Sequence, residues 1–134
     1  MRERILKPNG VYRHFKGKFY RLLGINNDFE LLEGIDLNLS EMVHCGQVLH
    51  TENKKVYNVY VFSGNSIAEN AVIIDDKGNV VKDKYVIYMA LYMDICQELG
   101  YLGYIRPYDL FVSKTDTEKY PNADQLYRFE YGNR

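Results

Sequence analysis

The chain contains no tryptophan, only two cysteines and only three histidines among its 134 residues. Cys45 and Cys96 are too few for a disulfide framework and belong to no cysteine metal motif. His14, His44 and His50 lack the spacing of metal ligands on a helix, so we expect no metal site. The sequence also has no glycine-rich phosphate loop and no serine nucleophile elbow. These gaps favour a non-catalytic protein that needs no cofactor over an enzyme.

Long apolar runs are missing as well. No segment is long enough to span a membrane, and no apolar stretch follows the charged opening MRERILKPNG, so we expect neither membrane insertion nor a signal peptide. The net charge of −1 argues against general DNA binding. We expect a single domain over residues 1–134 in the reducing cytoplasm, with both cysteines as small buried side chains.

Positively charged Lys and Arg residues are missing from residues 26–52 of the chain. Residues 1–25 carry seven Lys or Arg and one Glu, a net charge of +6, whereas residues 26–52 carry six Asp or Glu and no Lys or Arg. The two stretches could contact each other within one protomer, contact each other across a dimer, or remain separate solvated surfaces. Their complementarity leads us to expect a homo-oligomer.

Tyrosine is abundant, with 13 Tyr beside 6 Phe, and it favours half-buried strands. The alternation in VYRHFKGKFYRLLGI, residues 11–25, predicts a hairpin that turns around Gly17. Its first strand would place Tyr12, His14 and Lys16 on one face. The predicted edge or bend near Pro107 would hold a second group of Tyr and Arg residues.

Other elements follow from local patterns along the chain. We predict a strand over residues 56–62, a hairpin around the turn at residues 76–79, and a closing strand over residues 126–131. One or two helical turns could form over residues 40–46, and residues 85–100 begin like a strand and could continue as a helix. Residues 29–39 could form a strand pair or an acidic loop. The fold class is therefore mainly β, a small, strongly bent sheet or partly open β-barrel with one or two short helices.

The motif YRHFKG, residues 12–17, followed by LGI, resembles the opening signature of a bacterial and phage family of unknown function. Further motifs match that family in the same order along the chain. Two of them depart from the family pattern: the YIRP turn has Tyr where the family has Trp, and the last motif lacks the proline that precedes it in the family. The matching motifs are HTE at 50–52, a strand with Val59-Tyr60 or a second candidate strand over 86–92, YIRP at 104–107, LF at 110–111 and RF at 128–129.

This resemblance divides the chain into family-like parts and insertions. The family-like parts are about residues 10–25, 50–62 and 85–131, and the insertions are about residues 26–49 and 63–84. The resemblance implies a small β-fold without annotated chemistry. Insertions on such a fold would build something new, such as a pocket cover or an oligomer interface.

The candidate binding residues combine cationic and aromatic side chains that a small barrel could bring together: Tyr12, His14, Lys16, Tyr104, Arg106 and Arg128. Arginine offers a planar fork for phosphate or carboxylate, and tyrosine offers a flat surface for a base or sugar. This set predicts a small, anionic, nucleotide-like ligand. The competing interpretation is that these cations cap a hairpin in water or pair with acids.

Two kinds of function fit these patterns. The first is a non-catalytic ligand-binding module, such as a phage-encoded sponge that sequesters a nucleotide-derived signal. The alternative is a protein- or RNA-interaction domain that uses the basic hairpin against an acidic surface.

Overall fold

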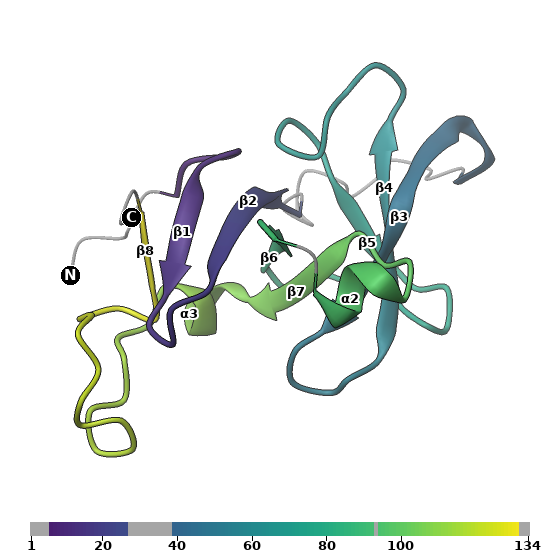
Figure 1. Cartoon of the computed structure of the whole chain (residues 1–134). Coiled ribbons are helices and arrows are strands. Elements are labelled where there is room, and N and C mark those ends of the chain that lie inside the picture. Colours follow the sequence, from purple (N-terminus) through teal and green to yellow (C-terminus); the bar gives the residue numbers. More distant parts are fainter. Residues whose placement is uncertain (1–5, 27–38, 93, 132–134) are drawn as a thin grey trace.

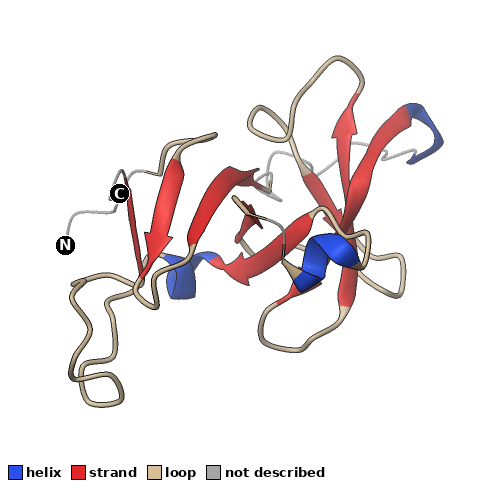
Figure 2. Ribbon diagram, viewed as in Figure 1, coloured by secondary structure: helices blue, strands red, loops and turns tan. Residues whose placement is uncertain are grey.

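The computed structural model describes residues 6–26, 39–92 and 94–131, which form one eight-stranded sheet with three short helical segments (Figures 1 and 2). The elements in chain order are β1 (Val11–His14), β2 (Phe19–Ile25), the 3-10 turn η1 (Leu39–Glu41), β3 (Met42–His50), β4 (Val56–Phe62), β5 (Val72–Ile74), β6 (Tyr85–Ala90), α2 (Ile95–Glu98), β7 (Gly103–Pro107), α3 (Tyr108–Phe111) and β8 (Phe129–Tyr131). None of the helices in this part of the chain has the length and apolar character needed to cross a membrane.

The strands follow the order β5-β4-β3-β7-β6-β2-β1-β8, so the sheet is open, with β5 and β8 at its ends. Neighbouring strands are antiparallel except β3 and β7, which are parallel. The prediction of a mainly β fold, with a sheet that does not close and short helices, is confirmed.

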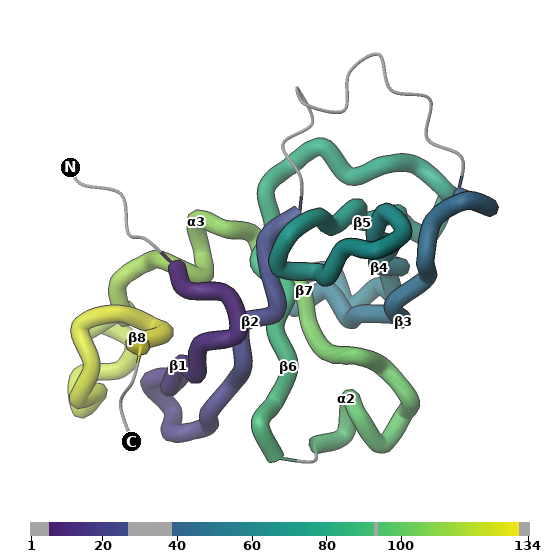
Figure 3. The backbone as a smooth tube through the Cα atoms, turned by 90° about the horizontal axis from the view of Figure 1, so that it is seen from above, coloured from purple at the N-terminus to yellow at the C-terminus, as the bar shows by residue number. Residues whose placement is uncertain are grey.

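Two hydrophobic cores lie on opposite faces of the central strands β6 and β7. Ile87 and Ile105 face the first core, which β3, β4 and β5 cover, while the cross-strand pair Tyr88 and Tyr104 faces the second. Figure 3 shows β6 between these two halves of the molecule. Residues 86–88 are all buried because both faces of the strand are covered.

The second half of the sheet, β8-β1-β2-β6-β7, curls around its own core. The Arg106 guanidinium of β7 lies 5.2 Å from the centre of the Phe129 ring of β8, although three strands separate β7 from β8 in the sheet. Helix α3 fills the interior, because its fully buried Phe111 stacks on Phe129 at 4.1 Å. The curl therefore brings residues of distant strands to one place.

Several local predictions are confirmed. The hairpin over 11–25 forms β1 and β2, and the strand over Val56–Phe62 is β4. The turn over residues 75–79 forms with the Asp75 N–H donating to the Asn79 carbonyl at 2.9 Å, and it leads back only to an isolated bridge between Ile74 and Val80. The strand over 85–90 gives way to α2, which ends before Gly100 at a φ of 88°.

Three local predictions need correction. The helix over residues 40–46 is only the 3-10 turn η1, because residues from Met42 onward pair with β4 and Gly46 takes a φ of 149° next to a register shift. β7 lies inside the sheet, which corrects the predicted edge, whereas the alternative prediction of a bend is confirmed, because Pro107 ends β7 at the bend into α3. The closing strand begins at Phe129, because Tyr127 instead forms a bridge with Lys114.

The two cysteines differ. Cys96 is buried as expected, and its thiol donates to the Gly103 carbonyl at 3.2 Å, whereas Cys45 is only half-buried. Neither takes part in a disulfide. The predicted strand pair or acidic loop over residues 29–39 lies outside the described residues except for its last position.

Candidate functional site

Four of the basic residues predicted from the sequence gather at one end of the curled half-sheet. His14 ends β1, Lys16 lies in the following turn, Arg106 comes from β7, and Arg128 directly precedes β8. Pairing of β1 with β8 places His14 opposite Phe129, and the Phe15 N–H donates to the Arg128 carbonyl at 2.9 Å. We call His14, Lys16, Arg106 and Arg128 the basic cluster.

His14 is held neutral within this cluster. Its ring lies 4.4 Å from the ring of Phe15 and 4.9 Å from that of Phe129, and its Nδ1 accepts a hydrogen bond from the Lys16 N–H at 3.2 Å. An accepting Nδ1 leaves the proton on Nε2. Burial, together with the charges of Arg106, Lys16 and Arg128, lowers the pKa of His14 to about 4. The imidazole is therefore neutral at physiological pH, and the three cations add to the effect of its burial.

The two arginines of the cluster have unused donors. The Nε atoms of Arg106 and Arg128 are buried and have no hydrogen-bond partner among the described residues. Arg106 does have contacts, since its guanidinium lies over Phe129 and hydrogen-bonds the Tyr88 side chain. Buried N–H donors without partners are uncommon in folded proteins, and a bound ligand is one way to satisfy them.

No acid neutralises the cluster within the described part of the chain. The ion pairs found there are Arg13 with Asp124 at 3.1 Å and Lys55 with Asp76 at 3.8 Å, and neither involves a cluster residue. Cations that converge without a counter-charge repel one another, and an anion placed between them would relieve that repulsion. The geometry thus favours binding of an anion.

Aromatic rings extend the cluster on one side. Tyr20 lies 6.5 Å from His14, 5.3 Å from Tyr88 and 6.3 Å from Tyr104, measured between ring centres. The Tyr104 hydroxyl donates to Asp94 Oδ2 at 2.6 Å, and burial together with this carboxylate raises the pKa of Tyr104. The phenol therefore stays neutral and fixed in place, as a surface that stacks on a ring should be.

The structure brings together five of the six predicted residues but not the sixth. Tyr12 is 2% exposed, its ring packs against Phe111, and its hydroxyl accepts the Lys7 N–H at 2.8 Å. Tyr12 shares a face with His14, as the alternation of β1 predicts, but it lies deeper in the core. We therefore leave Tyr12 out of the binding site and assign it to the packing beneath the site.

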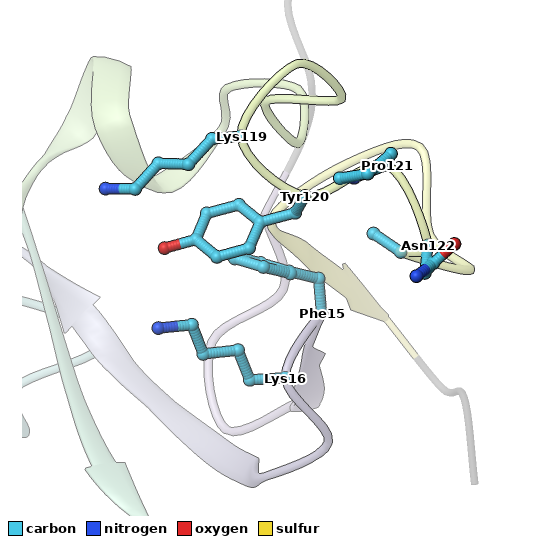
Figure 4. Close-up of a pocket in the computed structure, with 7 residues that line it drawn as sticks. Phe15, Lys16, Lys119, Tyr120, Pro121 and Asn122 are labelled. Carbon is cyan, nitrogen blue, oxygen red and sulfur yellow. The ribbon is translucent and has the colours of Figure 1, made fainter.

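Sequence reasoning missed Lys119 and Tyr120, which lie in the loop between α3 and β8. They line a cavity of about 360 Å³ next to the basic cluster, together with Phe15, Lys16, Pro121, Asn122 and Ala123 (Figure 4). We call this cavity the Tyr120 pocket. The only signal in the sequence was a lysine beside an aromatic residue, which carries little weight in a loop without periodicity.

The chain matches no family model, no curated protein and no solved structure. The resemblance of YRHFKG and the later motifs to the bacterial and phage family therefore stays a prediction. Within the described ranges, no group of three or more His, Cys, Asp or Glu side chains could hold a metal ion. The functional assignment accordingly depends on the geometry of the basic cluster and its aromatic neighbours.

Proposed function

We propose that this protein is a non-catalytic module that binds a small anionic ligand with an aromatic ring, such as a nucleotide-derived molecule. The observation that carries the proposal is the basic cluster itself, in which Arg106, Arg128 and Lys16 surround a neutral His14 with no ion pair among the described residues. Such an arrangement costs stability unless an anion occupies it.

The chemistry of the neighbouring side chains fits a nucleotide better than a simple inorganic anion. Arginine binds phosphate oxygens through its planar fork, and the buried Nε atoms of Arg106 and Arg128 supply donors for this purpose. Tyr20 and Tyr104 provide aromatic surface beside the cluster, since the Tyr20 ring lies 6.5 Å from the His14 ring and 6.3 Å from the Tyr104 ring. Stacking on such rings is worth about 1–3 kcal/mol per base in nucleic-acid binding proteins.

A biological setting follows from the resemblance of the YRHFKG motif to the phage and bacterial family. We propose a phage-encoded sponge that acts in the cytoplasm and sequesters a nucleotide-derived signal. Such a protein needs affinity but no chemistry. Homo-oligomerisation would suit this role, since a second copy could complete the binding surface.

A protein-interaction domain is the second candidate function, and the exposed apolar surface around α2 favours it. Tyr92, Ile95 and Leu99 are 73%, 68% and 66% exposed, respectively. Apolar side chains gathered on a surface often mark a contact with another protein. If the basic hairpin instead binds acidic protein or RNA, affinity should fall steeply with salt concentration.

The experiment that tests the first function compares wild type with Arg106→Lys. Lysine keeps the charge but loses the fork, so we expect the affinity for the ligand to fall at least about tenfold while the melting temperature changes by a few degrees or less. Small molecules released by denaturation are first identified by mass spectrometry, beside a thermal-shift panel of mononucleotides and cyclic dinucleotides. Affinities are then measured by calorimetry.

Lys77→Gln provides the matched control. Lys77 is exposed in the turn after β5, so its substitution removes a charge far from the cluster both in the sequence and in the sheet. It should bind like the wild type. Equal affinity of wild type and Arg106→Lys would contradict the assignment of Arg106. A protein that releases no nucleotide and is stabilised by none would shift the assignment to the interaction domain.

A further inference from the structure

We infer that the Tyr120 pocket is a second anion subsite, and that the ligand carries two anionic groups close together, as a diphosphate does. This inference rests on the proposed function and deepens it, because it specifies the class of ligand. The first anionic group would lie at the basic cluster, and the second between Lys16 and Lys119 beside the Tyr120 hydroxyl.

The geometry of the pocket already places three polar groups together. The Lys16 Nζ lies 5.2 Å and the Lys119 Nζ 5.5 Å from the centre of the Tyr120 ring. Figure 4 shows the two lysines on either side of this ring, with both ammonium groups pointing in the same direction as the hydroxyl. A phosphate group placed at that end of the ring would meet donors from all three side chains.

The electrostatics of the pocket agree with this geometry. Burial alone would raise the pKa of the Tyr120 hydroxyl, but the charges of Lys119 and Lys16 and their hydrogen bonds outweigh burial and lower it. Within the described residues, neither lysine forms an ion pair with a carboxylate. The two ammonium groups are therefore directed at the Tyr120 hydroxyl and not at a carboxylate, which leaves their charge available to an anion.

The loop that carries Lys119 and Tyr120 is fixed before any ligand arrives. Asp116 organises it, since its Oδ1 accepts the N–H groups of Glu118 and Lys119 at 3.1 and 3.2 Å, and its carbonyl accepts that of Tyr120 at 2.8 Å. The Tyr120 ring then packs on Phe15 at 4.7 Å. A preorganised loop loses little entropy on binding, which favours affinity.

Lys16 joins the two subsites. Its ammonium group lies 5.9 Å from the centre of the Phe15 ring, and that ring contacts the His14 ring of the basic cluster at 4.4 Å and the Tyr120 ring of the pocket at 4.7 Å. Lys16 also acts on the pKa of both His14 and Tyr120. One phosphate could occupy only one of these positions at a time. Two phosphates linked by a shared oxygen, or held by one sugar, could occupy both and share Lys16.

Calorimetric titration with inorganic phosphate and inorganic pyrophosphate, in magnesium-free buffer, tests this inference. We expect pyrophosphate to bind at least about tenfold more tightly than phosphate to the wild type. Lys119→Gln should remove most of this difference, and Tyr120→Phe should reduce it, because each substitution takes away a donor of the second subsite. Lys77→Gln should leave both affinities unchanged, and Arg106→Lys should weaken both.

The outcomes separate the inference from the proposed function. If phosphate and pyrophosphate bind equally, or if Lys119→Gln and Tyr120→Phe both bind pyrophosphate like Lys77→Gln, the second subsite is wrong while the first stands. If neither anion binds and no nucleotide binds, both proposals fail. Lys119 is exposed, so its substitution should leave the melting temperature unchanged, which thermal unfolding of each variant checks.

Discussion

Replacing Phe111 by alanine is expected to lower the free energy of unfolding by about 4 kcal/mol, a large share of the stability of a domain of this size. Phe111 is fully buried, and its ring stacks on Phe129 at 4.1 Å with planes 10° apart. It also contacts Tyr12 at 5.8 Å and Tyr88 at 5.4 Å. Alanine would leave a cavity where β1, β6 and β8 meet, and the rigid curl of the sheet limits how far they can close it.

Urea denaturation at neutral pH measures this loss, with two variants for comparison. Phe111→Leu keeps much of the buried volume and should cost clearly less, about 1–2 kcal/mol. Tyr92→Ala removes an aromatic ring that is 73% exposed and should change stability by less than about 0.5 kcal/mol. A Phe111→Ala protein as stable as Tyr92→Ala would show that α3 is not part of the core.

The binding site depends on the same packing. The Phe129 ring contacts both Phe111, at 4.1 Å, and the Arg106 guanidinium, at 5.2 Å, so a change in its packing on Phe111 alters the support for the cation. A variant that folds with a loosened Phe129 should therefore bind anions less tightly. Packing in the core of this half-sheet therefore supports the binding site through the Phe129 ring.

The strands of this fold were predictable because their signal is local. Alternation of polar and apolar residues fixes β1, β2 and β4 within the sequence itself. The region from Met42 to Gly46 misled the sequence reasoning, because a serine cap and a following glycine also suit a short helix. Pairing with β4 and a left-handed Gly46 decide the outcome, and both depend on residues far along the chain.

The site was predictable in its residue types but not in its assembly. Alternation placed Tyr12 and His14 on the same face, but it could not show which position the curl would cover. Tyr12 is the second residue of β1 and is buried, while His14 ends the strand and stays partly open. The contact of Arg106 with Phe129 likewise needs the curl, which no local pattern encodes.

Lys119 and Tyr120 could not be found from the sequence for a different reason. Their loop has no periodicity, and its shape comes from backbone hydrogen bonds to Asp116 and from packing of Tyr120 on Phe15. Asp116 is an ordinary turn residue, and the ring contact joins positions more than a hundred residues apart. Only the folded chain shows that two lysines meet at this ring.

The second prediction with a large effect is that the free energy of unfolding falls at acid pH, mainly because of His14. The folded pKa of His14 is about 4 and its ordinary value is 6.5, so the unfolded chain binds more protons than the folded chain between these values. Stability is therefore fully present above about pH 6.5, and it is lost as the pH falls toward about 4. After allowance for solvent screening at a partly open ring, the loss amounts to about 2 kcal/mol.

Denaturation of wild type and His14→Gln at about pH 7.5 and about pH 4.5 measures the contribution of His14 to the pH dependence of stability. Glutamine can still accept the Lys16 N–H, but it does not titrate, so the variant should lose less stability on acidification than the wild type. His50 remains in both proteins and cannot account for the difference. Burial lowers the pKa of His50 too, and its Nδ1 accepts the Glu52 N–H at 3.0 Å. An equal loss in both proteins would show that His14 keeps its ordinary pKa, so that neither burial nor the cations of the cluster act on it, and would remove the electrostatic basis for an anion site there.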